Sequence, residues 1–148
     1  MAVKIGGGLI VAVIELLEKH PQVRERLQKR LEYLLVDEYQ DTNRAQFDLL
    51  NLLVNQQHNI CVVGDEDQSI YSWRGADIRN ILDFEKVYSD TKVIKLEQNY
   101  RSSKNIIEAA SYVIEKNADR IGKKMWTDNQ QEEQIAVIEC HSDKEEAS

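Results

Sequence analysis

The sequence predicts an α/β fold with a mainly parallel sheet, on three observations. Two short apolar runs, 33–36 and 59–63, each end in an acidic turn, as strands buried on both faces of a parallel sheet do. Two further apolar runs, 92–96 and 135–140, predict a third and a fourth strand. Segments with helical spacing of apolar residues alternate with these runs. Alternating strands and helices are typical of layered α/β domains.

The helices are placed by their apolar spacing and by residues that favour helix ends. The segment 9–19 predicts a first helix, and Pro21 suits the first position of the next one. Short polar side chains before an apolar stripe predict helix starts, because their oxygens accept from unpaired amides. The helices predicted in this way begin after Thr42 or Asn43, after Asp77, and after Ser102 or Ser103, and run to about residues 56, 88 and 117.

Composition excludes several classes of protein. The chain has 148 residues, of which 42% are hydrophobic and 30% charged, so it is globular rather than disordered. The longest apolar run, 9–14, is too short to span a bilayer, and no membrane partner is expected. Cys61 and Cys140 lack CxxC spacing, which favours a reducing, cytoplasmic compartment over a disulfide framework. The three histidines are scattered and form no zinc pattern.

The charge distribution limits how the chain can bind a polyanion. The net charge is −7, with six basic and four acidic residues in 1–36 and 13 basic and 22 acidic residues in 37–148. This balance excludes a nucleic-acid binder that works by bulk positive charge. It leaves room for a local groove built from a few placed residues.

The first chemical signal is the segment VDEYQD at 36–41. Asp37 and Glu38 follow a predicted buried strand, at the end of a sheet where ligands bind in open α/β folds. One carboxylate there can hold the water shell of Mg²⁺, and the other can polarise an attacking water. A solvated acidic turn is the alternative, because a two-residue motif recurs by chance.

The second signal is the segment GDEDQSIYSWRGA at 64–76, which also follows a predicted strand. The amide of Gln68 could sense a γ-phosphate, and Tyr71 and Trp73 beside Arg74 could stack on unpaired bases. The alternative is a surface loop in which Trp73 fills the core.

The third signal is the segment QNYRSS at 98–103, between a predicted strand and a capped helix. The guanidinium of Arg101 could reach a phosphate with a bidentate fork. The alternative is an exposed arginine near a helix start. Trp126, in a later apolar spot, is expected to be a packing residue.

Taken together and in this order, VDEYQDTN, VVGDEDQSIYSWRGADI and KLEQNYRSS resemble motifs II, III and IV of superfamily 1A DNA helicases, the UvrD/PcrA/Rep family. The resemblance runs from about Leu16 to Ile138. It implies a three-layer αβα, RecA-like P-loop NTPase architecture, incomplete in this chain. It also implies that Gln40 and Asp41 orient their neighbours in the motif II turn. The other implied roles are Mg²⁺ binding by Asp37, general base for Glu38, linkage of the γ-phosphate to DNA movement by Gln68, base stacking by Tyr71 and Trp73, coupling of the two sites by Arg74, adenine packing by Tyr100 and an arginine finger at Arg101.

The resemblance is to part of a helicase. A GxxxxGK[ST] phosphate loop is absent, since Leu9 and Ile10 follow Gly6–Gly8 where lysine and a hydroxyl residue are needed. The expected divisions are an unmatched segment 1–15, the later part of the first motor domain at 16–98, and the start of the second at 99–148. The missing partners are then the phosphate-loop half and the rest of the second motor domain, and residues 1–5 are a candidate substitute strand.

The expected function of the parent protein is Mg²⁺-dependent ATP hydrolysis coupled to 3′–5′ movement on single-stranded DNA and duplex unwinding, in replication or repair. The chain alone is expected to be inactive. Two alternatives stay open: a single-stranded DNA-binding module without turnover, and an interaction fragment whose aromatic loop is idle.

Overall fold

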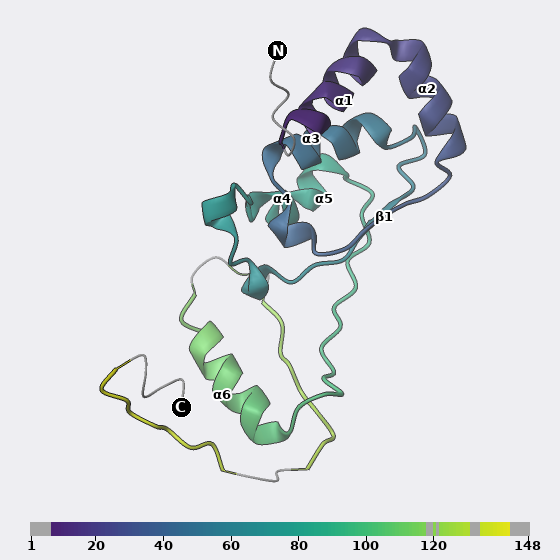
Figure 1. Cartoon of the computed structure of the whole chain (residues 1–148). Helices are drawn as coiled ribbons and strands as arrows, with labels where there is room; N and C mark the ends of the chain where they lie inside the picture. The colour runs from purple at the N-terminus through teal and green to yellow at the C-terminus, as the bar shows by residue number, and fades with distance from the viewer. Residues whose placement is uncertain (1–6, 118–119, 121, 131–133, 143–148) are drawn as a thin grey trace. The chain divides into compact units, whose positions relative to one another are not determined.

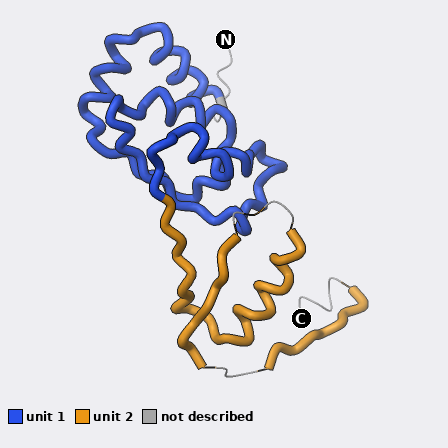
Figure 2. The backbone as a smooth tube through the Cα atoms, turned by 180° about the vertical axis from the view of Figure 1, so that it is seen from behind, with its two compact units in different colours: residues 1–92 blue, residues 93–148 orange. Residues whose placement is uncertain are grey.

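A computed structural model of the chain describes residues 7–117, 120, 122–130 and 134–142. The chain divides into two compact units, residues 1–92 and residues 93–148 (Figure 2). Residues 1–5, the candidate substitute strand, lie outside the described residues.

Three helices form one side of the first unit (Figure 1). They are α1 (Gly7–Lys19), α2 (Pro21–Arg30) and α3 (Arg44–Leu53), which confirms the predicted helices at 9–19 and from Pro21. Leu17 of α1 is 1% exposed. The side-chain amide of Gln28 in α2 donates to the carbonyl oxygens of Leu52 and Val54, at 2.9 and 3.0 Å, and so ties α2 to the end of α3.

Helix α3 begins where the sequence predicts, and its start is held twice. Asn43 Oδ1 accepts from the Gln46 amide at 3.0 Å, and Gln46 Oε1 accepts from the Asn43 amide at 2.9 Å. This reciprocal capping satisfies two amides that the helix itself cannot pair.

The sheet has two parallel strands in the part of the chain that the structure describes, β1 (Leu34–Val36) and β2 (Ile60–Val62). Leu34 lies opposite Ile60, Leu35 opposite Cys61, and Val36 opposite Val62. Val36, Ile60 and Val62 pack against the core, whereas Leu35 is 78% exposed. The prediction that both strand faces are buried is therefore wrong here, because the described residues supply helices to one face of the strands.

The core of the first unit is aromatic. Tyr39, Phe84 and Tyr88 are all buried, with ring centroids 5.5 Å apart for Tyr39 and Phe84 and 4.9 Å for Phe84 and Tyr88. The Tyr88 hydroxyl donates to Asn51 Oδ1 of α3 at 2.8 Å. Since Tyr39 follows Glu38 directly, the acidic turn is anchored in this core.

The helix predicted after Asp77 is wrong in its length, because the structure has two short helices there, α4 (Arg79–Leu82) and α5 (Phe84–Val87). The break lies at Asp83, which sits at the start of α5 rather than inside a helix. Aspartate has a low helix propensity, which suits a position between two helices, although its side chain makes no capping hydrogen bond here. The side chain of Asp83 accepts from Lys86 Nζ at 2.6 Å.

The second unit contains α6 (Lys104–Ile114), which confirms the helix predicted after Ser103. The strands predicted at 92–96 and 135–140 are wrong: both segments lack strand pairing. Backbone pairing needs a neighbour, and the described residues of this unit offer one only at Gln98, which forms an isolated parallel bridge with Trp126. Leu96 and Val137, one in each of these segments, are 78% and 94% exposed.

The described residues therefore show an α/β arrangement with a small parallel sheet. The three-layer RecA-like architecture stays a prediction. Among these residues no helix has the length and apolar character needed to cross a membrane.

The buried hydroxyl of Tyr39 predicts an alkaline limit to the stability of the first unit. Burial, together with the nearby Tyr88, raises the pKa of Tyr39 from 10.0 to about 12. Tyr39 therefore loses its hydroxyl proton at a lower pH in the unfolded chain than in the folded one. The stability that neutral Tyr39 contributes is full below the unfolded pKa of 10.0 and is lost as the pH rises through the folded pKa of about 12. We expect the Tm to fall between these two pH values, and to fall less in Tyr39→Phe.

Thermal unfolding followed by circular dichroism at several pH values measures this effect. The control is Tyr33→Phe, because Tyr33 is 73% exposed. The same alkaline slope in Tyr39→Phe as in the unchanged chain would contradict the prediction.

Candidate functional site

The two carboxylates of the first signal leave the end of β1 together and are exposed. Glu38 has φ 50° and ψ 42°, a left-handed conformation that costs a residue other than glycine about 1 kcal/mol. Asp37 Oδ1 accepts from the Glu38 amide at 2.9 Å, which helps to hold this turn. The turn thus directs backbone and side chains away from the strand while the next residue, Tyr39, enters the core.

Gln40 connects the acidic turn to the loop after β2. Its side chain is 1% exposed; Nε2 donates to Glu38 Oε2 at 2.7 Å, and Oε1 accepts from the Asp65 amide at 3.0 Å. The Tyr39 amide also donates to the Val63 carbonyl at 3.0 Å. Asp41, the other residue expected to orient the turn, has a buried Oδ1 without a hydrogen-bond partner in the described part of the chain.

Gln68 lies in a short 3-10 turn, Glu66–Gln68. Its Nε2 donates to Asp65 Oδ2 at 2.7 Å, and Asp65 Oδ1 accepts from the Asp67 amide at 3.0 Å. Because the Asp65 amide also donates to Gln40, a continuous series of hydrogen bonds runs from Gln68 through Asp65 and Gln40 to Glu38.

The aromatic residues of the second signal form an exposed cluster. Trp73 is 73% exposed and Tyr71 is 37% exposed, with ring centroids 6.4 Å apart. The Arg74 guanidinium lies 4.4 Å from the Trp73 centroid and 5.2 Å from the Tyr71 centroid. Gly75 ends this turn with φ 87°, which glycine adopts without strain. The alternative that Trp73 fills the core is wrong.

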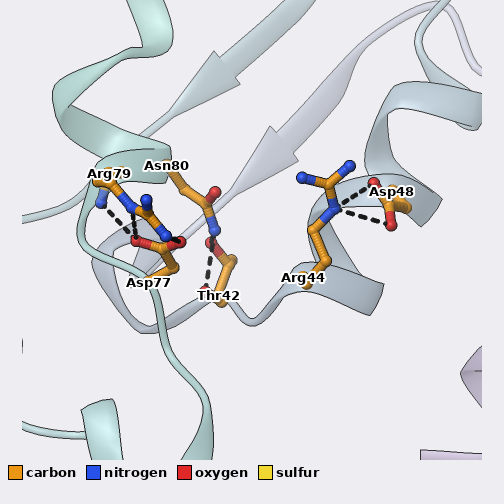
Figure 3. A network of polar contacts seen from close by, with 6 residues as sticks. All are labelled: Thr42, Arg44, Asp48, Asp77, Arg79 and Asn80. Atoms are coloured by element: carbon orange, nitrogen blue, oxygen red, sulfur yellow. Dashed lines mark hydrogen bonds and ion pairs between the residues drawn. The ribbon is translucent and has the colours of Figure 1, made fainter.

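A second set of contacts, which the sequence did not predict, joins Thr42, after the acidic turn, to Asp77 and Asn80, after the aromatic loop (Figure 3). Asn80 Nδ2 donates to the carbonyl oxygen and to Oγ1 of Thr42, at 3.0 and 3.1 Å, and the Asp77 amide donates to the same carbonyl at 3.1 Å. Hydrogen bonding from Arg79 holds the pKa of the Asp77 carboxyl below its usual value. Thr42 and Asn80 are polar residues 38 positions apart, and nothing in the sequence indicates that they pair.

The third signal lies in the second unit. Asn99 Oδ1 accepts from the amides of Arg101 and Ser102, at 2.9 and 2.8 Å, and so forms a turn before α6. Tyr100 is 78% exposed, and its hydroxyl donates to Gln98 Oε1 at 2.8 Å. Arg101 is exposed. Trp126 is 45% exposed and pairs its backbone with Glu97 and Asn99, so it packs less completely than predicted.

The donor chemistry of the acidic turn fits Mg²⁺. The residues described here contain no group of three or more His, Cys, Asp or Glu that could enclose a metal. Magnesium in nucleotide sites is held by one or two carboxylates, waters and phosphate oxygens, so it needs no such group. The exposed carboxylate of Asp37 supplies a hard oxygen of the required kind.

Comparison with known proteins places the sequence of this chain among helicases. The model for the UvrD/REP helicase N-terminal domain matches residues 7–89, and the model for the UvrD-like helicase C-terminal domain matches residues 94–148. The chain therefore belongs to the UvrD-like helicase family, which confirms the resemblance seen in its motifs.

Individual relatives agree with this assignment. The ATP-dependent DNA helicases PcrA of Staphylococcus epidermidis and of Staphylococcus aureus are each 52% identical to this chain over 139 residues. The match covers 94% of this chain and 19% of each relative, so the chain spans about a fifth of their length.

The contacts of Asn80 give a testable prediction for the link between α4 and Thr42. Asn80→Ala removes two hydrogen bonds to Thr42 in a partly buried place, so we expect a loss of about 1–3 kcal/mol in the free energy of unfolding. The control is Arg79→Ala, because Arg79 makes an exposed ion pair with Asp77, and exposed ion pairs contribute little to stability. Urea unfolding followed by circular dichroism measures both, and an equal loss in the two variants would contradict the role of Asn80.

Proposed function

We propose that this chain is the segment of an ATP-dependent DNA helicase that joins the hydrolytic carboxylates to a DNA-contacting loop. The observation that carries the proposal is the pair of links between the acidic turn after β1 and the segment that follows β2. Gln40 makes one link to Asp65, near the start of the aromatic loop, and Thr42 makes the other to Asn80 of α4, just beyond that loop. A motor that couples hydrolysis to movement on DNA needs such a connection, because the two sites must respond to each other.

In the proposed reaction Glu38 accepts a proton from the attacking water. The water oxygen bonds to the γ-phosphorus, the bond from that phosphorus to the bridging oxygen of ADP breaks, and ADP and phosphate leave. Asp37 would hold Mg²⁺, which would offset the negative charge that develops on the phosphoryl oxygens. Gln68 contacts the γ-phosphate, and Tyr100 and Arg101 contribute adenine packing and an arginine finger.

The aromatic cluster is the proposed contact to single-stranded DNA. Tyr71 and Trp73 offer ring faces to unstacked bases, and Arg74 adds a cation beside both rings. We further propose 3′–5′ movement with duplex unwinding, in replication or repair in the cytoplasm, where two unpaired cysteine thiols are stable.

A second candidate is a single-stranded DNA-binding module without turnover. It is favoured by one feature: the 148 residues contain no GxxxxGK[ST] loop to hold the β- and γ-phosphates, while the aromatic cluster is exposed. The two candidates differ in ATP hydrolysis, since only the first requires it from the longer protein.

We expect the isolated chain to hydrolyse ATP at the background rate. A chimera in which residues 7–142 replace the equivalent segment of the Staphylococcus aureus relative supplies the remaining parts. In that chimera we expect DNA-stimulated hydrolysis, and a loss of at least about 100-fold in kcat on Glu38→Gln, because general-base catalysis contributes that much or more. Phosphate release with and without oligothymidine measures both proteins.

The control for this experiment is Glu66→Gln, an acid in the loop after β2 for which no role is proposed. Steady hydrolysis by the isolated chain would contradict its expected inactivity. A chimera whose hydrolysis does not depend on Glu38 would contradict the proposed function.

We expect weak, salt-sensitive binding of single-stranded DNA by the isolated chain, because the net charge of −7 opposes a polyanion. Trp73→Ala should weaken binding between about 5-fold and 150-fold, the equivalent of one stacked base. Trp126→Ala is the matched control and should change binding little. Fluorescence anisotropy of labelled oligothymidine at two salt concentrations measures this, and equal losses in the two variants would show that the loop is not the platform.

A further inference from the structure

Gln40 is buried while the carboxylate that it contacts is exposed. Both polar atoms of its side-chain amide form hydrogen bonds: Nε2 donates to Glu38 Oε2 at 2.7 Å, and Oε1 accepts from the Asp65 amide at 3.0 Å. Turning the amide over would place two acceptors together at Glu38 and two donors together at Asp65, so the two partners fix its orientation. A buried amide without partners is costly, which keeps both bonds formed.

The contact limits the freedom of Glu38. An exposed glutamate side chain samples several rotamers, and fixing one costs free energy that a partner must supply. Asp37 holds the amide of Glu38 and Gln40 holds its carboxylate, so both ends of the residue are positioned by neighbours in the same turn.

The other end of Gln40 reaches the loop that carries the aromatic cluster. Asp65 is the second residue of that loop, and its carboxylate accepts from Gln68. The main-chain carbonyl oxygen of Gln40 also accepts from Ser69 Oγ at 3.4 Å. A shift of this loop therefore changes the partners of the same amide that holds Glu38.

The close approach of the two loops depends on glycine at position 64. A Cβ added there would lie 2.7 Å from Gln40 Oε1, 2.8 Å from Ile81 Cδ1 and 3.3 Å from the Gln40 backbone nitrogen. The Ile81 methyl can move, but the Gln40 amide is bonded on both sides. Any side chain at position 64 must displace Gln40 from its partners.

We propose that Gln40 is a positioning residue that transmits the state of the aromatic loop to the Glu38 carboxylate. When the loop is in place, the Asp65 amide orients Gln40, and Gln40 orients Glu38 toward the attacking water. This inference rests on the proposed function, since it assigns Gln40 a part in the same reaction. It adds a residue that touches neither nucleotide nor DNA.

The first test uses the chain itself and needs no turnover. Gln40→Met keeps the size of the side chain and removes both hydrogen bonds. We expect the Asp65 amide to exchange its hydrogen about tenfold faster, the effect of losing one hydrogen bond, measured by nuclear magnetic resonance. Gln28→Met is the matched control, because it also removes two bonds of a partly buried glutamine, at the end of α3. Equal exchange at Asp65 in both variants overturns the linkage.

The second test measures hydrolysis in the chimera with the Staphylococcus aureus relative. We expect Gln40→Met and Gly64→Ala each to lower the DNA-stimulated kcat about 10- to 100-fold with little change in KM for ATP, because a small misplacement of a reacting group costs that much. Gln28→Met should leave both constants within about twofold, since it loses stability without moving Glu38.

Two outcomes separate this inference from the proposed function. If Glu38→Gln leaves hydrolysis intact, the proposed function fails. If Glu38→Gln abolishes hydrolysis but Gln40→Met does not lower kcat, or lowers it no more than Gln28→Met does, the function stands and the role of Gln40 is overturned. A variant that fails to fold is recognised by faster exchange at amides throughout the first unit, and Gly64→Ala then provides the second route to the same displacement.

Discussion

The parallel pairing of β1 and β2 is the constraint on which the site depends. Val36 lies opposite Val62, so the residues that follow each strand leave the sheet at the same edge. Parallel strands require a crossover, which α3 provides between them. The acidic turn and the aromatic loop are thus neighbours, although about 26 residues separate Glu38 from Gly64 in the chain.

The core and the site share one short turn. Tyr39 is buried against Phe84, while the residues on either side of it, Glu38 and Gln40, form the catalytic candidate and its support. Packing of the tyrosine ring holds the turn in place and offsets the cost of the left-handed Glu38 backbone. A change that loosens this core therefore acts on the site as well as on stability.

The two units differ in how far their apolar residues are covered. The first unit buries an aromatic cluster, whereas Ile94, Leu96 and Val137 in the second are each at least 70% exposed. Contiguous exposed apolar patches are typical of interaction surfaces. The chain spans about a fifth of its relatives' length, and the predicted strands in the second unit lack neighbours among the described residues.

The sequence by itself determined most of the helices, the two strands of the sheet and the family, because spacing, capping and motif order are local properties. It missed the break at Asp83 and predicted strands at 92–96 and 135–140, since strand formation needs a partner that local spacing does not reveal. Only the tertiary structure decided that Gln40 joins Glu38 to Asp65 and that Asn80 of α4 donates to Thr42. Those bonds depend on strand register and on the close approach at Gly64, which arise when distant segments pack together.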